Sequence, residues 1–375
     1  MIRSSRNIFR SYKIIRALGR FGATFILYDL ALPKPICWIF SKIGDKPRKE
    51  FADLRKGQRL SELLQSLGPS FIKMGQALST RPDLVGNEIA DDLSQLRDSL
   101  SPFPASEAIE MIEKQLQTKL ENLFQSFENE PIAAASIAQV HIAKLPNDLE
   151  VAVKVLRPNI EEFFHRDTDY FLWIAEILEW LLPDIRRLGP ISVVKTFRTA
   201  VEAEMDLRLE AAAASELGEN FQDQDTFKVP SIDWKRTDRR VMTAERVNGI
   251  PLKDRESLIA NGRNPDIVVK NLLSSFLIQA FRDGFFHADL HQGNLFVDEN
   301  NNILAVDFGI MGRLDKKTRR YVAEVLLAFL AGDYHRAAEI HFEAGYVPQD
   351  KSIAAFAQAC RSFGEPILEY NPKEI

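Results

Sequence analysis

Residues 287–309, "HADLHQGNLFVDENNNILAVDFG", constrain the fold of this chain most strongly. Two short apolar runs flank "DENNN", a pattern typical of a β-hairpin with a polar turn. The hairpin would return Asp307 to the neighbourhood of the loop that carries Asp289 and Asn294. Asp, Asn, Gly and His also gather in loops that have no chemistry, because they are turn formers. The rest of the sequence must therefore decide whether this loop is catalytic.

The hydrophobic periodicity changes along the chain from helical to strand-like and back. Residues 50–125 carry apolar side chains at intervals of three and four, and Ser106 opens a capping-box pattern. "IAQVHIAKL" and "LEVAVKVL", separated by "PND", predict an antiparallel hairpin. Helices follow over 158–222, broken at "LLPD" and "LGP", and two strand candidates come next, "FKVPSIDW" and "RRVMTAERVNG". Mainly helical sequence then returns, so we expect an α+β chain of two lobes with a hinge near 246–252.

Asp289, Asn294 and Asp307 have the order and spacing of a phosphoryl-transfer site. In such enzymes a loop Asp orients or deprotonates the acceptor, and an Asn five residues later binds Mg²⁺. Mg²⁺ keeps several waters, so one carboxylate, one amide oxygen and the phosphates of ATP complete its shell. His287 and His291 frame the same loop. We interpret both as structural, because the loop offers no third ligand for zinc.

Lys154 ends the run "VAVK" on the second predicted strand. A lysine on a half-buried sheet needs an anionic partner, and ATP phosphates with a helix carboxylate would supply one. Glu204, Asp206 and Glu210 lie on the helix-forming stretch "EAEMDLRLEAAAASEL", and one glutamate could pair with Lys154. Taken singly, the lysine also fits a side chain that reaches water, and the acids fit a solvated helix face.

The glycine-rich phosphate loop of ordinary protein kinases is absent. Before the first strand of the hairpin the chain reads "PIAAASIAQVH", and alanine adopts positive φ less readily than glycine. The backbone N–H groups of Ala134, Ala135, Ser136 and Ile137 could still face phosphates, with a differently shaped cover. An ordinary protein kinase is therefore disfavoured.

Charge is distributed unevenly along the chain. Residues 1–60 hold 14 Lys/Arg and 4 Asp/Glu, which gives them a net charge of +10. The whole chain has a net charge of −5, so the remaining residues carry −15. An acidic body disfavours a nucleic-acid protein, whereas the basic first twenty residues predict an amphipathic helix with Ile8, Tyr12 and Ile15 at helical spacing. That helix could contact an anionic membrane, pack as an ordinary helix, or serve as an organellar presequence.

Residues 21–40 carry Asp29, Lys34 and two prolines, which argues against a membrane-spanning helix. The two cysteines, Cys37 and Cys360, are far apart, so a reducing compartment fits best.

The motifs together resemble the UbiB/AarF family of atypical kinases, which includes the Coq8 and ADCK proteins. The resemblance rests on these segments, in family order over about residues 50 to 345: "FIKMGQALSTRPDL" with its K-x-G-Q motif, "AAAS", "VAVKVLRP", the E-x-D motif "EMD" within "EAEMDLRLEAA", "HADLHQGN" and "DFG". Gln292 departs from the family, since bacterial relatives usually carry proline there. Many bacterial members also continue into a C-terminal hydrophobic segment, which this sequence does not contain, so any anchoring is expected at the N-terminus.

The resemblance implies a protein-kinase-like, two-lobed fold whose N-terminal helical extension covers the active site and obstructs protein substrates. It implies ATP and Mg²⁺ as cofactors, with ATPase activity or small-molecule phosphorylation in ubiquinone biosynthesis. Expected partners are a quinone-precursor lipid or another small molecule, the membrane surface and quinone-biosynthesis enzymes. The expected location is the inner face of the bacterial inner membrane, or the mitochondrion if the source is eukaryotic. The implied roles are ATP binding by Lys73, Gln76, Ala134, Ala135, Ser136 and Lys154, ion pairing by Glu204, Asp206 and Glu210, catalysis by Asp289 with Lys154, and Mg²⁺ binding by Asn294 and Asp307.

The expected organisation has four parts. These are a basic amphipathic segment at 1–49, a helical K-x-G-Q extension at 50–127, an N-lobe with an antiparallel sheet and a helical insertion at 128–248, and a helical C-lobe with the catalytic loop at 249–375. Two other functions stay open. One is a catalytically weak, nucleotide-binding scaffold that organises quinone-biosynthesis enzymes, and the other is an antibiotic- or choline-type phosphotransferase, which the K-x-G-Q extension disfavours.

Overall fold

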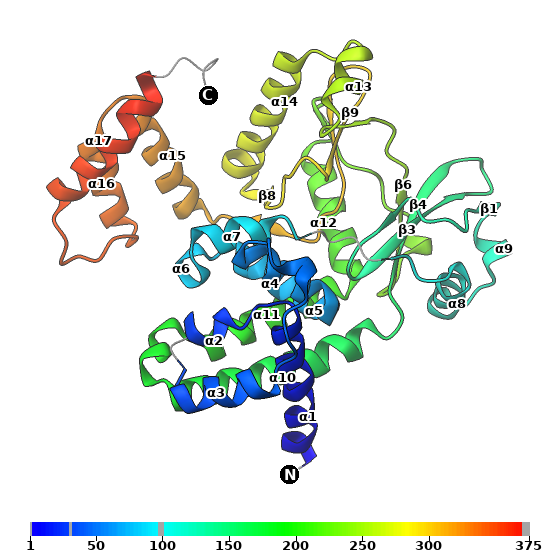
Figure 1. Cartoon of the computed structure of the whole chain (residues 1–375). Helices are drawn as coiled ribbons and strands as arrows, with labels where there is room; N and C mark the ends of the chain where they lie inside the picture. Colours follow the sequence, from blue (N-terminus) through cyan, green and yellow to red (C-terminus); the bar gives the residue numbers. More distant parts are fainter. Residues whose placement is uncertain (1, 30–31, 97–100, 370–375) are drawn as a thin grey trace. The chain divides into compact units, whose positions relative to one another are not determined.

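The computed structural model describes residues 2–29, 32–96 and 101–369, and the chain divides into two compact units (Figure 1). Each unit is built from two stretches of sequence. Unit 1 comprises Met1–Leu209 and Ile232–Arg246, and unit 2 comprises Glu210–Ser231 and Val247–Ile375. The elements combine helices with small sheets in each unit, as expected for the α+β class.

Unit 1 opens with a run of helices. They are α1 (Ile2–Arg20), α2 (Phe25–Asp29), α3 (Lys34–Ile43), a 3₁₀ turn at Lys49–Phe51, α4 (Lys56–Leu67), α5 (Pro69–Ser79), α6 (Pro82–Val85), α7 (Asn87–Ser94), α8 (Ala105–Leu116) and α9 (Leu120–Leu123). A helix, α1, forms over the basic first twenty residues, as predicted. Only part of its apolar pattern is buried, however, because Ile15 is enclosed while Ile8 and Tyr12 are exposed.

Helices α4, α5 and α7 pack closely around one apolar core. Gly68 ends α4 with φ 105°, and Pro69 starts α5 at the first helical position, where a missing N–H costs nothing. At Gly75, within K-x-G-Q, an added Cβ would lie 2.4 Å from Leu96 Cδ1 and 2.6 Å from Leu64 Cδ1. The glycine of this motif therefore permits the close approach of three helices.

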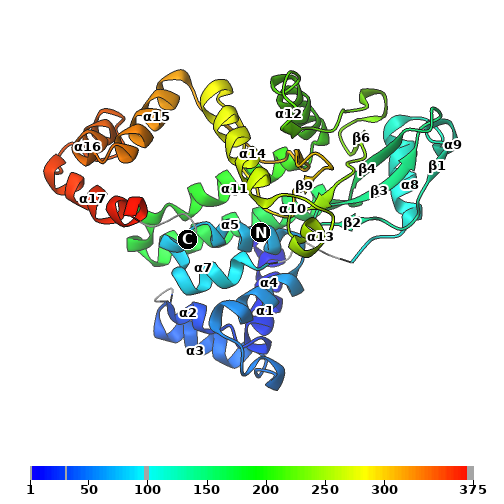
Figure 2. The same ribbon diagram turned by 90° about the horizontal axis from the view of Figure 1, so that it is seen from above.

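An antiparallel sheet forms the second half of unit 1. Its strands are β1 (Ser126–Phe127), β2 (Ala133–Ala134), β3 (Ala138–Lys144), β4 (Glu150–Leu156) and β6 (Val241–Glu245). The order is β1-β3-β4-β6, with β2 also on β3, and β3–β4 is the hairpin predicted from "PND". Helix α8 covers one face, where Ala108 and Ile112 pack against Val151, Val153 and Val155 (Figures 1 and 2).

The long helical region after the sheet is broken where the sequence predicts. The pieces are α10 (Ile160–Leu181), a 3₁₀ segment at Pro183–Leu188, α11 (Pro190–Glu204) and α12 (Leu207–Asn220). Helix α10 packs against α5 and α11 in unit 1, with Phe71 of α5 edge-on to Phe171 at a centroid distance of 4.9 Å. These contacts join the K-x-G-Q helix to the helices that follow the sheet.

Unit 2 contains two small sheets. The first has the order β5-β10-β9-β7, from β5 (Phe227–Lys228), β7 (Ile250–Pro251), β9 (Leu295–Val297) and β10 (Ile303–Ala305). The second pairs β8 (Phe285–His287) with β11 (Met311–Arg313). The antiparallel pair β9–β10 confirms the hairpin predicted before "DFG".

Two local expectations differ from the structure. Helix α8 begins at Ala105 after Pro104, and no side chain caps it, so the capping box predicted at Ser106 is wrong. The fixed φ of Pro104, −56°, starts the helix early enough to place Ser106 inside its first turn. The first strand candidate after α12 is also shorter than its pattern suggests, since only Phe227–Lys228 of "FKVPSIDW" form a strand. This strand, β5, pairs with β10 in parallel, whereas β6 joins the antiparallel sheet.

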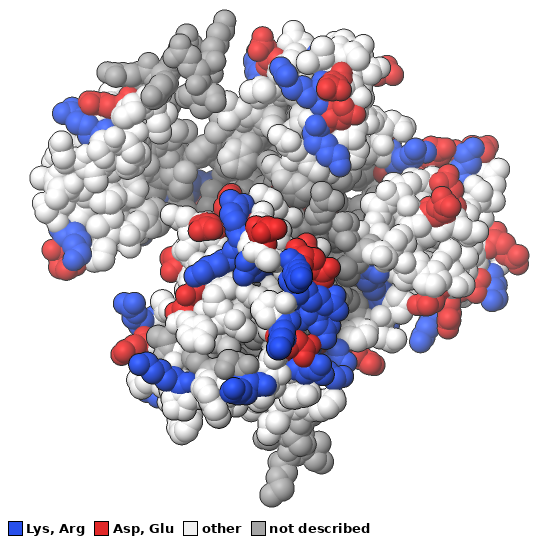
Figure 3. All heavy atoms as spheres, in the orientation of Figure 1, with Lys and Arg blue, Asp and Glu red and all other residues white. Residues whose placement is uncertain are grey.

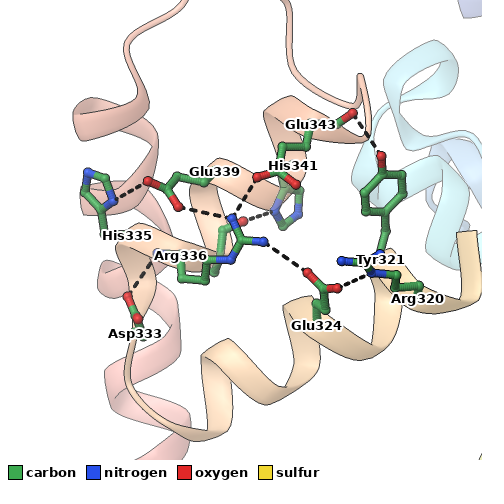
Figure 4. A network of polar contacts seen from close by, with 10 residues as sticks. Arg320, Tyr321, Glu324, Asp333, His335, Arg336, Glu339, His341 and Glu343 are labelled. Atoms are coloured by element: carbon green, nitrogen blue, oxygen red, sulfur yellow. Dashed lines mark hydrogen bonds and ion pairs between the residues drawn. The ribbon is translucent and has the colours of Figure 1, made fainter. Parts of the chain in front are cut away.

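Unit 2 contains α12 from Glu210 onward. Its other helices are α13 (Arg255–Ala260), α14 (Pro265–Leu277), a π-helical continuation at Ile278–Asp283, α15 (Lys316–Leu330), α16 (Tyr334–Glu343) and α17 (Ile353–Glu369). The π segment ends at Gly284, with φ 68°, which confirms the predicted C-terminal glycine. Arg336 of α16 joins α15 to α16 by contacting Glu324, Glu339 and Glu343 (Figure 4). Within the described ranges, every helix is too short or too polar to cross a lipid bilayer.

Candidate active site

Lys154 occupies the face of β4 opposite the apolar core of unit 1. Strand alternation buries Val153 and Val155 against the core and turns Lys154 to the other face, where it is partly exposed. Its neighbours across the sheet are Val140 on β3 and Met242 on β6. A central strand thus holds the ammonium on a rigid apolar surface, the position that the sequence predicts for an ATP lysine.

The alanine-rich segment forms a tight turn between β2 and β3. Ala135 N donates to Ala138 O at 2.8 Å, so Ser136 and Ile137 lie at the tip. None of the five residues from 134 to 138 has positive φ, which fits a turn built without glycine. The Ala135 N–H is used within the turn, so a phosphate contact by this group would require the turn to open. Ser136 is fully buried, and its Oγ has no hydrogen-bond partner among the described residues.

Arg157 ties this turn to the segment before α8. Its Nε and Nη2 donate to Ala135 O at 3.0 and 2.8 Å, and its Nη1 donates to Ser101 O at 3.0 Å. The guanidinium also lies 5.6 Å from the ring centre of Phe103. This role is not predicted from the sequence. Arg157 is visible in "VAVKVLRP", but the carbonyls that it binds are brought to it only by folding.

A buried amide fastens the same segment to β3. Gln139 accepts from Phe103 N at 3.1 Å and donates to Phe103 O at 3.2 Å, as a strand partner would. His141 lies beside it, with Nε2 at 2.9 Å from Gln139 Nε2 and Nδ1 at 2.8 Å from Glu128 O. Burial lowers the pKa of His141. A neutral imidazole that accepts from Gln139 at Nε2 and donates to Glu128 O at Nδ1 satisfies both contacts.

Lys73 of α5 forms an ion pair with Glu204, the last residue of α11. The Lys73 Nζ–Glu204 Oε2 distance is 2.9 Å, and both side chains are less than a fifth exposed. The structure thus shows the contact expected between the K-x-G-Q and E-x-D motifs. Gln76 follows Lys73 by three residues on α5, so the two share one side of the helix.

Asp206 and Glu210 occupy the start of α12. Asp206 accepts from the backbone N and side chain of Arg208, which lowers the pKa of its carboxyl group. Its pairing with the K-x-G-Q segment stays a prediction. Glu210 lies in the first turn of α12 and is 7% exposed, a burial unusual for a carboxylate unless it is paired. The Lys154–Glu210 pairing also stays a prediction, because these residues belong to different units.

His287 holds the predicted catalytic loop of unit 2. Its Nδ1 accepts from Asp289 N at 3.1 Å, so the ring proton lies on Nε2, which faces Val306 O at 3.5 Å. Burial lowers the pKa of His287, and its ring lies 5.5 Å from that of Phe308, in "DFG". Both ring nitrogens are therefore engaged in fixing the loop, which agrees with the structural role expected for this histidine.

Asn294 and Asp307 are fixed by backbone contacts of the same region. Asn294 Nδ2 donates to Asp289 O at 3.2 Å, which turns the amide oxygen Oδ1 away from that carbonyl. Val306 N donates to Asn294 O at 2.9 Å, so the loop and the strand that leads to Asp307 are joined. Asp307 has φ 63°, a left-handed conformation that is uncommon for a residue other than glycine and that clusters at functional sites.

The donor set of this region fits Mg²⁺ better than zinc. An amide oxygen from Asn294 and a carboxylate from Asp307 are hard ligands, and water and phosphate oxygens would complete an octahedron. No cluster of three or more His, Cys, Asp or Glu side chains that could hold a metal occurs among the described residues. His291 lies at the loop surface, where its Nδ1 accepts from Gly293 N at 3.0 Å.

Comparison with known families agrees with this geometry. Residues 95–341 match the model of the ABC1 atypical kinase-like domain. The chain is 42% identical over 326 residues to a protein of Marinobacter nauticus named "Probable protein kinase UbiB", covering 86% of this chain and 60% of that protein. It is 39% identical over 375 residues to a protein of the same name from Pseudomonas aeruginosa, covering 96% of this chain and 70% of that protein. The chain therefore spans about 60 to 70% of the length of these relatives.

A solved structure shares the fold. Its title reads "The complex structure of Rv3197-erythromycin from Mycobacterium tuberculosis". The similarity has a TM-score of 0.58 at 25% sequence identity, and it covers 79% of this chain and 74% of that one. The fold similarity thus extends well beyond the catalytic loop.

Proposed function

This chain belongs to the ABC1 family of atypical kinase-like proteins, and from that premise we propose that it is an ATP- and Mg²⁺-dependent phosphotransferase or ATPase that supports ubiquinone biosynthesis. The observation that carries the proposal is the loop of unit 2. There His287 fixes Asp289, Asn294 is tied to the Asp289 carbonyl, and Asp307 follows in a left-handed conformation. Held in this order, the three polar groups provide the acceptor and metal functions of phosphoryl transfer.

Each unit supplies its own groups to the proposed chemistry. In unit 1, Lys154 binds ATP phosphates from its rigid strand. Lys73 and Gln76 reach the nucleotide from α5, and Ala134, Ala135 and Ser136 form the turn that covers the phosphates. Glu204 orients Lys73 through their 2.9 Å ion pair.

In unit 2, Asp289 orients the acceptor hydroxyl or water and accepts its proton. Asn294 Oδ1 and the Asp307 carboxylate hold Mg²⁺, which supplies positive charge to the phosphate oxygens when it is bound. The backbone bonds around both residues fix their positions before nucleotide arrives. Such preorganisation is the main contribution that a protein makes to phosphoryl transfer.

The acceptor in this proposal is a small molecule, a quinone-precursor lipid or water rather than a protein. Support comes from the K-x-G-Q extension (50–127), whose α5 is tied by Lys73 to the E-x-D motif. We place the protein peripherally on the inner face of the bacterial inner membrane, in contact with quinone-biosynthesis enzymes. The relatives named above are bacterial, and the basic N-terminal helix supplies a membrane-binding element.

The test is ATP hydrolysis by the purified protein, with Mg²⁺ or EDTA and with or without a prenylated phenol in detergent. We expect Mg²⁺-dependent turnover that Asp307→Asn and Asp289→Asn each reduce at least about 100-fold, the scale of an essential acid–base or metal group. Asp350→Asn, at an exposed carboxylate in the same unit, is the matched control and should leave turnover unchanged. Equal turnover in wild type and Asp307→Asn would contradict the metal assignment.

The alternative is a nucleotide-binding scaffold that organises biosynthetic enzymes without transferring phosphate. It predicts that the wild-type protein binds ATP but hydrolyses it no faster than the Asp289→Asn variant does. The presence of all three polar groups in one region of unit 2, joined by the Val306 N–Asn294 O hydrogen bond, favours the enzyme, since a scaffold needs no acceptor-activating carboxylate.

A further inference from the structure

Over residues 7–12, α1 has its polar side chains inside and its apolar side chains outside. Arg10 pairs with Asp167 of α10 at 2.5 Å, and Ser11 Oγ contacts Tyr170 Oη at 3.0 Å. The opposite side of the helix exposes Ile8, Phe9 and Tyr12, at 60, 61 and 45%. A helix that only packs on its own protein would show the reverse, with the apolar stripe inside.

Helix α3 presents a second exposed apolar surface. Trp38 is 63% exposed and Ile39 is 45% exposed, on the helix face that also carries Lys34 and Lys42. Lys42 Nζ lies 5.9 Å from the Trp38 ring centre. Tryptophan beside lysine is typical of helices that lie at the boundary between water and lipid.

The two helices are fastened to each other. Arg16 Nε and Arg20 Nη2 of α1 donate to Asp45, just after α3, at 2.7 and 3.0 Å. Gly19 makes room for this contact, because an added Cβ there would lie 2.2 Å from Asp45 O. The hydrogen bond from Arg16 lowers the pKa of the Asp45 carboxyl group. The exposed side chains of α1 and α3 therefore belong to one rigid part of unit 1.

The charge of this surface selects its partner. Helices α1 and α3 contain no Asp or Glu, and Lys13, Lys34 and Lys42 are exposed beside the aromatic rings. Figure 3 shows Lys and Arg spheres spaced along α3 and gathered over the neighbouring part of unit 1. The core of a protein–protein interface is depleted in lysine, whereas an anionic bilayer attracts it.

We propose that α1 and α3 form the docking face of this protein for an anionic bilayer, with Phe9 and Trp38 entering the interfacial layer and Lys13, Lys34 and Lys42 contacting lipid phosphates. The inference deepens the membrane part of the proposed function by naming the surface that binds. With ten residues, α3 is too short to span a bilayer, so docking is interfacial. Arg10 also lies 5.7 Å from the ring centre of Phe71, so the docked helix directly contacts α5 of K-x-G-Q.

Tryptophan fluorescence tests the proposal without nucleotide. The sequence has four tryptophans, so a full-length protein with Trp173, Trp180 and Trp234 changed to Phe reports on Trp38 alone. Vesicles of phosphatidylglycerol and phosphatidylethanolamine should shift its emission to the blue, and brominated acyl chains should quench it. A protein that retains only Trp234, also exposed in unit 1, is the matched control and should show neither effect.

Flotation with the same vesicles measures how much the aromatic side chains and the lysines each contribute to membrane binding. Trp38→Ser with Phe9→Ser should weaken partitioning at least about tenfold, as expected for removing two aromatic anchors. Lys34→Glu with Lys42→Glu should weaken binding to anionic vesicles and leave the low affinity for phosphatidylcholine vesicles unchanged. Trp234→Ser should change neither.

Three results would overturn the proposal. One is vesicle binding in which the emission of Trp38 does not change, because another surface would then be docked. Another is the absence of vesicle binding by the wild-type protein at low salt. A third is a dimer in solution that Trp38→Ser dissociates, since the face would then bind a second copy. None of these readouts depends on ATP hydrolysis, so docking and catalysis can fail separately.

Discussion

Arg157 shows how one side chain sets the geometry of a loop that has no glycine. Its guanidinium donates two hydrogen bonds to Ala135 O and a third to Ser101 O. Charged hydrogen bonds of this kind contribute about 1.5–3 kcal/mol each when they are well formed. The turn that we propose over the phosphates is thus held by Arg157, a residue outside the proposed ATP-binding set.

We predict that Arg157→Lys raises the dissociation constant for Mg²⁺-ATP about tenfold, because an ammonium cannot reproduce the fork that binds Ala135 O. The hydrolysis rate at saturating ATP should fall much less, since Asp289 and Asn294 are unchanged. Titration calorimetry and steady-state kinetics separate the two effects. Arg246→Lys, at an exposed ion pair with Glu150, is the control. A fall in rate with unchanged affinity would contradict the positioning role.

The buried histidines make stability depend on pH. Burial lowers the pKa of His141 and of His287 below the ordinary value, so the unfolded chain binds protons more readily than the folded one. Their contribution to stability is complete above about pH 6.5 and is lost as the pH falls through the lowered values. We predict that urea unfolding at pH 5.5 occurs at a lower midpoint than at pH 7.5.

His287→Gln should reduce this difference between the two pH values. The comparison uses the change in midpoint with pH, so a uniform loss of stability in the variant does not affect it. If the urea midpoint changes between pH 5.5 and pH 7.5 by the same amount in His287→Gln as in wild type, His287 does not titrate differently in the folded and unfolded states, and the prediction is wrong.

At the residue scale, contacts are predictable from the sequence where both partners lie on motifs with known order. The Lys73–Glu204 contact was expected and is present, as is the return of the strand before Asp307 to the loop that carries Asn294. Arg157 and Gln139 were missed because they bind backbone carbonyls and N–H groups of a distant segment. Backbone groups are the same in every residue, so the sequence does not identify such partners.

At the scale of elements, Gly75 explains why the K-x-G-Q helix tolerates no side chain at that position. We predict that Gly75→Ala destabilises the protein by about 1–3 kcal/mol, the usual cost of overpacking, because Leu64 and Leu96 occupy the space. Gly218→Ala is the matched change in α12, where a Cβ meets Val229 only at an ordinary 3.7 Å. It should be neutral or stabilise by up to about 1 kcal/mol. Chemical unfolding of both variants checks this, and equal effects would contradict the packing argument.

Hairpins and helix breaks were predictable, whereas strand partners and one cap were not. "PND" and "DENNN" each separate two apolar runs, and both segments form the expected antiparallel pairs. The parallel pairing of β5 with β10 joins residues more than 70 positions apart, which local patterns do not encode. The cap at Ser106 failed because the rigid backbone of Pro104 set the helix start first.

At the scale of the whole molecule, the basic N-terminus is part of unit 1 rather than an appendage. Ile15, Ala23 and Leu27 are buried, and Arg10 pairs with Asp167. We predict that deleting residues 1–45 costs about 3–6 kcal/mol, from the burial of Ile15 and Leu27 alone. Thermal unfolding of the truncated protein measures this loss. An unchanged melting temperature would show that α1 does not contribute to the core, and point variants remain the cleaner test of membrane docking.

The charge asymmetry and the two-unit division correspond to features visible in the sequence. The +10 segment supplies α1 and α3, and a unit boundary falls at Arg246, beside the hinge expected near 246–252. Sequence alone did not place 210–231 with the catalytic loop, since β5 joins that unit only by pairing with β10. The division into units therefore follows spatial pairing as well as chain order.

The central claim is that Asn294 and Asp307 bind Mg²⁺ together with ATP. The most direct measurement is calorimetric titration of ATP into wild type, Asn294→Ala and Asp307→Asn, each with Mg²⁺ and with EDTA. We predict that Mg²⁺ strengthens ATP binding to wild type at least about tenfold and has little effect on either variant. If both variants bind ATP with the affinity and Mg²⁺ dependence of wild type, the metal site lies elsewhere and the claim is wrong.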